Sequence, residues 1–289
     1  MGYRIGFDIG STTIKAVVLD ENNQICYKSY ERHKAQVRQK ALDKLVELKK
    51  YTKEPFKFAI SGSGALGLSE QGELPFVQEV FASATGVSKL YPETDCAIEL
   101  GGEDAKILFF QGSVEQRMNS TCAGGTGAFI DQMATLLNMS LEEMNEASLN
   151  YHRLYPIASR CGVFAKTDIQ PLINQGVDKC DLCASIFQAV VDQTITSLAQ
   201  GRKIEGNILF LGGPLYFMSG LRNRFVETLK LSDVQVNCPD TAINFVALGT
   251  AICADQEYTY DELYKALEDL VHAPAKLTES KPLFESDED

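Results

Sequence analysis

The sequence predicts an α/β protein made of two similar halves, each a mixed β-sheet flanked by helices. Two observations support this fold class. The pattern strand–strand–strand–helix occurs twice, which is the kind of internal repeat that indicates a duplicated architecture. Each copy also begins with the same motif, an apolar strand that ends in an acidic residue, then a glycine turn and a lysine, at 6–15 and 98–106. We expect a first lobe from residues 1–93 plus about 243–271, and a second lobe from residues 94–242.

In the first half, β-branched residues interrupted by polar breaks predict three short strands, at 3–9, 14–20 and 24–32. Apolar residues near helical spacing then predict a helix at about 35–50. A strand, a turn of serines and glycines, and a second helix follow, at 56–61, 61–64 and about 77–90.

The second half restarts with strands and a glycine-rich turn that leads into a helix, at 95–100, 105–111, 113–118 and about 124–137. Ser140 followed by Glu143 is a capping signal for another helix. The later elements are a long helix, a buried strand and three helices, at 181–204, 208–211, 215–229, 242–255 and 257–271. The acidic, proline-containing residues 272–289 are expected to form a tail or linker, as in a fragment of a longer polypeptide.

Length and charge exclude several function classes. At 289 residues and 45% hydrophobic, the chain can bury a sizeable core. Its 27 basic and 39 acidic side chains give a net charge of −12, which argues against a nucleic-acid or anionic-membrane surface. The apolar runs fall short of a spanning helix, and the N-terminus leads directly into a strand rather than a signal peptide. We expect a soluble cytoplasmic protein.

Eight cysteines are many for such a protein but too diluted for a disulfide scaffold. Cys180 and Cys183 have a metal-binding spacing, yet no second pair completes a zinc site, so we expect Cys183 to pack inward. Packing is also the expected role of four cysteines in apolar or turn contexts, Cys26, Cys96, Cys238 and Cys253. The three histidines, His33, His152 and His272, are isolated and are expected at the surface or in a polar core.

The two glycine turns carry the chemistry. Glycine lets a backbone approach a ligand closely, and consecutive amides in such a turn form an anion-binding concavity. Two facing turns would hold a nucleoside triphosphate from both sides, through Gly10, Ser11, Thr12, Thr13, Gly101, Gly102 and Glu103. Asp8, Glu99 and Asp104 are candidates for holding Mg²⁺ through water and for orienting the attacking water. Lys15 and Lys106 are further candidates for phosphate contact, although a lysine at a strand start is more often solvated.

Two other glycine segments lie where a ligand could approach. Gly212, Gly213 and Pro214 form a corner between a buried strand and a helix, and such a corner can also be purely structural. Gly124 and Gly125 lie at a helix start, where amide dipoles favour an anion or a thiolate such as that of the nearby Cys122.

Four stretches together resemble one known family. Within the acetate kinase–sugar kinase–heat-shock 70–actin superfamily, residues 3 to about 255 resemble activators of 2-hydroxyacyl-CoA dehydratases and the related ATPase subunits of benzoyl-CoA reductase. The stretches are Asp8-Ile9-Gly10-Ser11-Thr12, Glu99-Leu100-Gly101-Gly102-Glu103-Asp104, Cys122-Ala123-Gly124-Gly125-Thr126-Gly127 and Ser159-Arg160-Cys161-Gly162-Val163-Phe164-Ala165. Short stand-alone members usually carry Asp and Gln where this chain has Glu99 and Glu103, so the chain is more similar to the first domain of long, fused members.

The resemblance implies two ribonuclease H-like lobes of the actin-like ATPase type, with ATP or ADP and Mg²⁺ in the cleft between them. It assigns Gly212, Gly213 and Pro214 to adenosine. It also implies a homodimer that shares one [4Fe–4S] cluster, because Cys122 and Cys161 supply two thiolates per chain and such a cluster takes four. The implied role is ATP-dependent delivery of a low-potential electron to a dehydratase- or reductase-type partner, fused or separate, with ferredoxin or flavodoxin as the electron donor.

Two alternatives share the fold. A small-molecule kinase of the amino-sugar type would need a base beside a substrate hydroxyl, and Asp104 could serve. An actin-like assembly protein is the non-enzymatic alternative.

Overall fold

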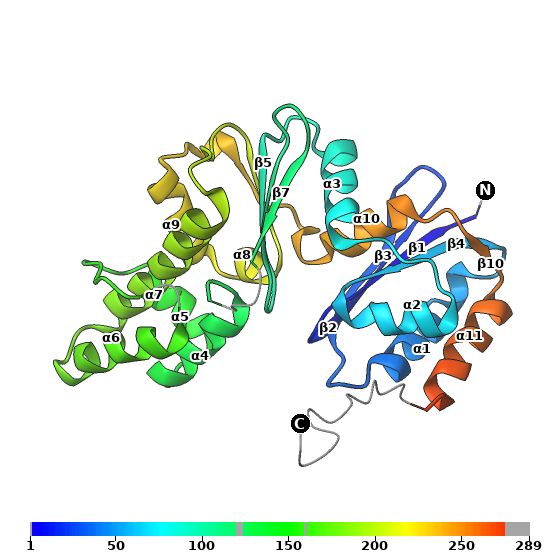
Figure 1. The fold of residues 1–289 in the computed structure, drawn as a ribbon, viewed down its shortest axis with the longest axis horizontal. Coiled ribbons are helices and arrows are strands. Elements are labelled where there is room, and N and C mark those ends of the chain that lie inside the picture. Colours follow the sequence, from blue (N-terminus) through cyan, green and yellow to red (C-terminus); the bar gives the residue numbers. More distant parts are fainter. Residues whose placement is uncertain (1, 120–123, 159–160, 275–289) are drawn as a thin grey trace, which may run out of the picture.

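A computed structural model describes residues 2–119, 124–158 and 161–274 of the chain. It contains two five-stranded mixed sheets, one in each of two lobes (Figure 1). The predicted fold class is confirmed, and the two halves repeat one another at the level of the sheets.

The first sheet has the strand order β10-β4-β1-β2-β3. Strand β1 pairs antiparallel with β2 and parallel with β4, and β2 pairs antiparallel with β3. The strands are β1 (Arg4–Ile9), β2 (Thr13–Leu19), β3 (Ile25–Arg32), β4 (Phe56–Ser61) and β10 (Glu257–Tyr258).

The second sheet has the order β7-β6-β5-β8-β9. Its strands β8, β5, β6 and β7 have the same order and relative directions as β4, β1, β2 and β3 of the first sheet. The strands are β5 (Cys96–Leu100), β6 (Ala105–Phe109), β7 (Glu115–Met118), β8 (Ile208–Leu211) and β9 (Val236–Asn237).

The outer face of each sheet is covered by its own helices. The first sheet packs its outer core against α1 (Val37–Glu47), α2 (Leu66–Gly72) and α11 (Tyr260–His272). The helices of the second lobe are α4 (Gly127–Leu137), α5 (Leu141–Ser148), α6 (Gly162–Asn174), α7 (Lys179–Thr194), α8 (Gly213–Phe217) and α9 (Ser219–Leu229).

A third core lies between the two sheets and joins the lobes. It is built around α10 (Phe245–Cys253) and α3 (Glu79–Leu90), which lie between the lobes in Figure 1. Gly6 permits this packing, because a Cβ at that position would lie 2.3 Å from the Ala247 carbonyl of α10. Gly249 does the same for α3, since its Cβ would lie 2.0 Å from the Ala82 carbonyl. Close backbone approach therefore holds α10 against the first sheet and against α3.

Several helical regions differ from the sequence prediction. Helices α2 and α6 were not predicted, because α2 is short and contains two glycines, and α6 contains Pro171 and buries only two of its residues. The predicted helix at 215–229 is two helices that meet at Met218, where the backbone is extended. The capping box at Ser140 is confirmed.

Helix α7 begins two residues before the predicted start and continues as a π-helical turn at Ile195–Ala199, not to residue 204. Residues 179–199 are long and apolar enough to cross a membrane by length and composition alone, contrary to the sequence reading. Within the protein, however, 67% of the most apolar stretch of this segment is buried, and α7 forms the centre of the second lobe's core. This is the environment of a core helix.

Candidate functional site

Each lobe presents one acid–lysine pair on the inner face of its sheet. Side chains alternate along a strand, so Asp8 lies on the same face as Gly6, which contacts α10, and Glu99 lies on the same face as the inner-core residue Ala97. Asp8 pairs directly across the ladder with Lys15, and Glu99 with Lys106. The two copies of the motif are thus equivalent in register.

The expectation that these lysines are solvated is wrong. The Lys15 Nζ lies 2.7 Å from Asp8 Oδ2, and the Lys106 Nζ lies 3.4 Å from Glu99 Oε1, with only 4% of the Lys106 side chain exposed. Each lysine lies directly opposite its carboxylate on the neighbouring strand and pairs with it, and Lys15 keeps 18% of its side chain exposed. Both lysines neutralise buried carboxylates.

Asp8, Glu99 and their lysines form a cluster of charges between the lobes. Sequence reasoning missed a third acidic residue of this cluster, Glu79. It begins α3, and its carboxylate accepts a hydrogen bond from the Lys106 Nζ. One helical turn further on, Ser83 Oγ donates to Glu99 Oε2 at 3.1 Å. Because positions four apart share a helix face, α3 contacts the acid–lysine pair of the second lobe with both residues. The acidic first turn of an interior helix was the only sequence signal.

Burial shifts the ionisation of the cluster. Desolvation raises the pKa of Asp8 above its ordinary value, although Lys15 opposes the shift. Desolvation also raises the pKa of the half-buried Asp104. Burial alone would lower the pKa of Lys106, but the charges of Glu99 and Glu79 raise it above its ordinary value. These carboxylates would gain from a nearby cation, because a positive charge favours their ionised form.

The two glycine turns have equivalent backbone geometry. In the first, Gly10 N–H donates to the Thr13 carbonyl at 2.9 Å, and in the second, Gly101 N–H donates to the Asp104 carbonyl at 2.7 Å. Other carbonyls of both turns also accept hydrogen bonds from behind: those of Gly10, Thr12, Gly101, Gly102 and Glu103.

The amides at the tips of the two turns differ from the carbonyls in their hydrogen bonding. Within the described part of the chain, the structure records no acceptor for the N–H groups of Ser11, Thr12, Gly102 or Glu103. The carbonyls of both turns are thus hydrogen-bonded to the protein, whereas the tip amides are available to a ligand. Such a set of backbone amides is the arrangement that binds anions.

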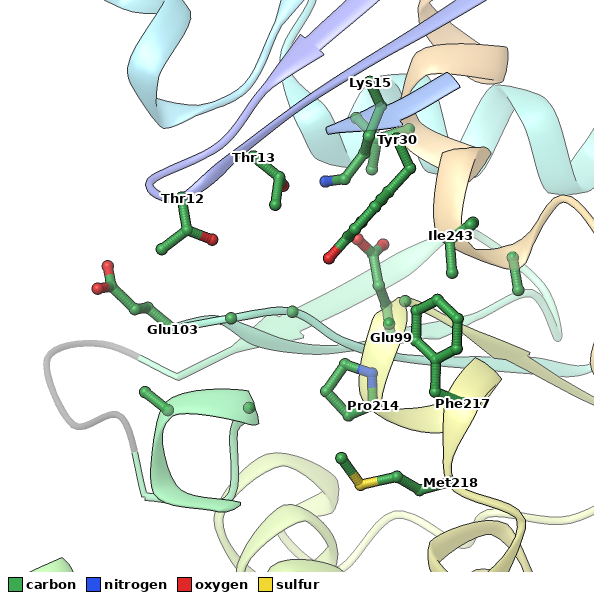
Figure 2. Close-up of a pocket in the computed structure, with 18 of the residues that line it drawn as sticks. Thr12, Thr13, Lys15, Tyr30, Glu99, Glu103, Pro214, Phe217, Met218 and Ile243 are labelled. Atoms are coloured by element: carbon green, nitrogen blue, oxygen red, sulfur yellow. The ribbon is translucent and has the colours of Figure 1, made fainter. Parts of the chain in front are cut away.

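A cavity of about 420 Å³ lies between the lobes, next to these turns. Figure 2 shows Thr12 and Thr13 on the first turn facing Glu103 and Pro214 of the second lobe. Eleven of the residues expected to contact nucleotide or metal line it: Asp8, Thr12, Thr13, Lys15, Glu99, Gly101, Gly102, Glu103, Gly212, Gly213 and Pro214. Gly10, Ser11, Asp104, Gly124 and Gly125 are not among its lining residues, and from the α4 start it is Gly127 and Ala128 that line it.

The corner after β8 forms another wall of the cavity. Gly212 has φ of +86°, and a Cβ there would lie 2.0 Å from the Leu100 carbonyl, so its role is close packing against β5. Gly213 is open, because the nearest atom to its Cβ would be Tyr30 Oη at 3.8 Å. Tyr30 of the first lobe and Phe217 of the second approach each other across this wall, with ring centroids 6.3 Å apart (Figure 2). Sequence reasoning named neither aromatic residue.

The cysteines divide into groups. Cys122 lies outside the described residues, and Cys161 is half-buried at the N-cap of α6. Cys183 packs inward as expected, and burial raises its pKa to about 12. Cys26 is exposed, contrary to the expectation that it packs, because it lies on the edge strand β3. Among the described residues, no group of three or more His, Cys, Asp or Glu is arranged to hold a metal ion by itself.

The sequence matches the BadF/BadG/BcrA/BcrD ATPase family over residues 5–254. It is 27% identical over 266 residues to the 2-hydroxyisocaproyl-CoA dehydratase activator of Clostridioides difficile, covering 90% of this chain and 96% of the relative. It is 28% identical over 257 residues to the (R)-2-hydroxyglutaryl-CoA dehydratase activating ATPase of Acidaminococcus fermentans, covering 87% and 96%. A structure of the activator of 2-hydroxyisocaproyl-CoA dehydratase from Clostridium difficile, with bound ADPNP, superposes with a TM-score of 0.76 at 26% identity. It covers 96% of this chain and all of that one (100%).

Proposed function

Because this chain belongs to the BadF/BadG/BcrA/BcrD ATPase family, we propose that it is an ATP-hydrolysing activator of a 2-hydroxyacyl-CoA dehydratase- or reductase-type partner. In this proposal ATP lies in the interlobe cavity, with its phosphates between the two glycine turns and its adenosine against Gly213 and Pro214. The named activities of the relatives and the ADPNP bound in the related structure support this assignment.

One observation carries the nucleotide part of the proposal. Among the residues that the structure describes, the tip amides of two equivalent turns, one from each lobe, have no recorded acceptor, and they lie beside a cavity of about 420 Å³ that buried carboxylates also line. Amides stabilise phosphate oxygens, and carboxylates suit a hydrated Mg²⁺, so the two halves of a metal–nucleotide complex have complementary groups on facing walls.

The donor set fits Mg²⁺, because the carboxylates of Asp8 and Glu99 supply oxygen ligands on the wall of the cavity beside the glycine turns. When bound, the metal would neutralise charge on the transferring phosphoryl group. Asp8 would hold it through water, and Glu99 or Asp104 would orient the attacking water. Lys15 and Lys106 would offset part of the negative charge of Asp8 and Glu99.

The electron-transfer part of the proposal depends on a [4Fe–4S] cluster shared by a homodimer. Cys161 fits a ligand role, because it is a free, half-buried thiol at the N-cap of α6. Cys122 would be the second ligand of each chain. A cluster held in this way supplies low-potential one-electron chemistry. Ferredoxin or flavodoxin would be the donor.

The nucleotide assignment is tested by ATP turnover and ADP affinity of Asp8→Ala, with the exposed Asp43→Ala on α1 as the matched control. We expect Asp8→Ala to lower turnover about a hundredfold and ADP affinity much less, because the metal acts mainly on charge that develops during transfer. Unchanged turnover in Asp8→Ala would overturn the assignment.

The cluster is tested separately under anaerobic conditions. We expect Cys122→Ala and Cys161→Ala each to lose the visible iron–sulfur absorbance, and Cys180→Ala and Cys183→Ala to retain it. Full iron content in the Cys161 variant would exclude this ligand set and would favour the kinase alternative.

A further inference from the structure

The carbonyls of the second glycine turn are held by hydrogen bonds from the start of helix α4. The first two amides of α4, at Gly127 and Ala128, donate to the carbonyls of Gly101 and Gly102 at 3.0 and 2.7 Å. The Glu103 carbonyl accepts a hydrogen bond from Asn119 Nδ2 at 3.1 Å. The backbone of a packed element therefore fixes the direction of this turn.

The first glycine turn is held by His33 instead. The His33 Nε2 lies 3.0 Å from the Gly10 carbonyl, which is the counterpart of Gly101, and the His33 amide donates to the Thr12 carbonyl at 3.2 Å. His33 follows directly after β3 and is 4% exposed. One residue thus satisfies two carbonyls of the turn.

The surroundings of the ring determine its tautomer. Ala35 N–H donates to Nδ1 at 3.2 Å, so Nδ1 is an acceptor and Nε2 carries the proton that is donated to Gly10. The turn that supplies this contact places Lys34 and Ala35 at φ of 49° and 62°. Two consecutive non-glycine residues in the left-handed region are unfavourable, and such conformations persist where the surroundings enforce them, often at functional sites.

We propose that His33 is a positioning residue for the phosphate groups of the nucleotide, acting through Gly10. In the first lobe, its imidazole donates to the Gly10 carbonyl; in the second lobe, a helix amide, that of Gly127, donates to the equivalent Gly101 carbonyl. By turning the Gly10 and Thr12 carbonyls back into the protein, it leaves the amides of Ser11 and Thr12 to meet phosphate oxygens. This inference rests on the proposed nucleotide site.

Two conservative variants separate the contacts of the two ring nitrogens. The amide nitrogen of glutamine is the same number of bonds from Cα as Nε2, so His33→Gln can keep the bond to Gly10. The amide oxygen of asparagine corresponds in the same way to Nδ1, so His33→Asn can keep only the acceptor for Ala35. His33→Leu keeps neither.

The experiment compares MgADP and adenosine affinity of the full chain by calorimetry. We expect His33→Asn and His33→Leu to bind MgADP about tenfold more weakly than wild type, which is the effect of one well-placed hydrogen bond, and His33→Gln to recover most of the loss. Adenosine affinity should stay unchanged in all three variants, which also shows that they are folded.

Two results would overturn the inference. One is near-wild-type MgADP affinity in His33→Asn with a loss in His33→Gln, which would assign His33 to the turn before α1. The other is an equal loss of adenosine affinity in every variant, which would indicate a general effect on the fold. Wild-type protein that binds no MgADP would instead overturn the nucleotide site itself, and the inference with it.

Discussion

At the scale of single residues, the centre of the molecule is a buried set of charges that joins the lobes. Lys106 of the second lobe contacts both Glu99 of its own sheet and Glu79 of α3. Removing one partner from a buried ion pair leaves an uncompensated charge, which is more costly than the pair is stabilising. The cluster is therefore sensitive to substitution at the lysine.

We expect Lys106→Met to lower the free energy of unfolding by about 3 kcal/mol, because two carboxylates lose their cation. The exposed Lys53→Met is the control and should change it by less than about 0.5 kcal/mol. Denaturant unfolding measures both. Equal stabilities of the two variants would show that Lys106 is not needed to offset these charges.

A pH dependence follows from Glu79. Burial raises its pKa, but the charge of Lys106, its hydrogen bond and then the charge of Lys15 bring the folded-state pKa below the ordinary value. A carboxyl with a lowered folded-state pKa contributes stability above its unfolded pKa, and that contribution is lost as pH falls through the folded pKa. The stability difference between wild type and Glu79→Gln should thus be full at neutral pH and shrink as pH falls below about 4.3. Parallel stability curves for the two proteins down to acid pH would contradict this.

At the scale of elements, two adjacent glycines at the strand-to-helix corner after β8 have different roles. Gly212 packs against the protein, and Gly213 faces the cavity. Gly212 has positive φ and no room for a Cβ, whereas the Cβ of an alanine at Gly213 would meet only ordinary contacts and lie at the cavity wall. The same corner therefore has a structural residue followed by a residue that faces the candidate ligand.

We expect Gly212→Ala to destabilise the protein by more than about 2 kcal/mol, because strained φ and a backbone clash add. Gly67→Ala is the matched control: its Cβ would meet no atom within 4 Å, and in helix α2 it should stabilise by about 0.5–1 kcal/mol. Thermal unfolding distinguishes them. A Gly212→Ala protein as stable as Gly67→Ala would show that the corner can relax.

At the scale of the whole molecule, the lobes meet through α3 and α10 on one side of the cavity, and through contacts such as that of Tyr30 with Phe217 on its wall. A ligand that contacts both glycine turns would therefore favour one relative orientation of the two lobes, since it would bind that orientation better than others. Such a coupling is what the proposed activator role requires.

The proposed shared cluster makes a further prediction at this scale. Iron should titrate at about four per dimer, because each chain offers two thiolates. Chelation should loosen the dimer, since a ligand bound only by the paired state stabilises that state. Sedimentation of reduced and chelator-treated protein measures both. A monomer that retains all of its iron would rule out the bridging geometry.

The sequence by itself determined the duplicated pattern of three strands and a helix, and the acid–glycine turn–lysine motif of each copy. The motif repeats the spacing of acid, glycine turn and lysine, and a short turn between antiparallel strands leaves Asp8 opposite Lys15 and Glu99 opposite Lys106. It also indicated which glycine turns would face one another. Weakly patterned helices such as α6 were missed, because a helix with few buried residues has little apolar periodicity.

Only the tertiary structure decided which distant residues complete the site. Glu79 reaches Lys106 because α3 packs between the sheets, and His33 reaches Gly10 because β3 returns beside β2. Tyr30 and Phe217 come from different lobes. Lys106, which was expected in water, is buried for the same reason. Local patterns report the faces of single elements, whereas these contacts depend on how close backbones approach at Gly6 and Gly249, which only the packed lobes define.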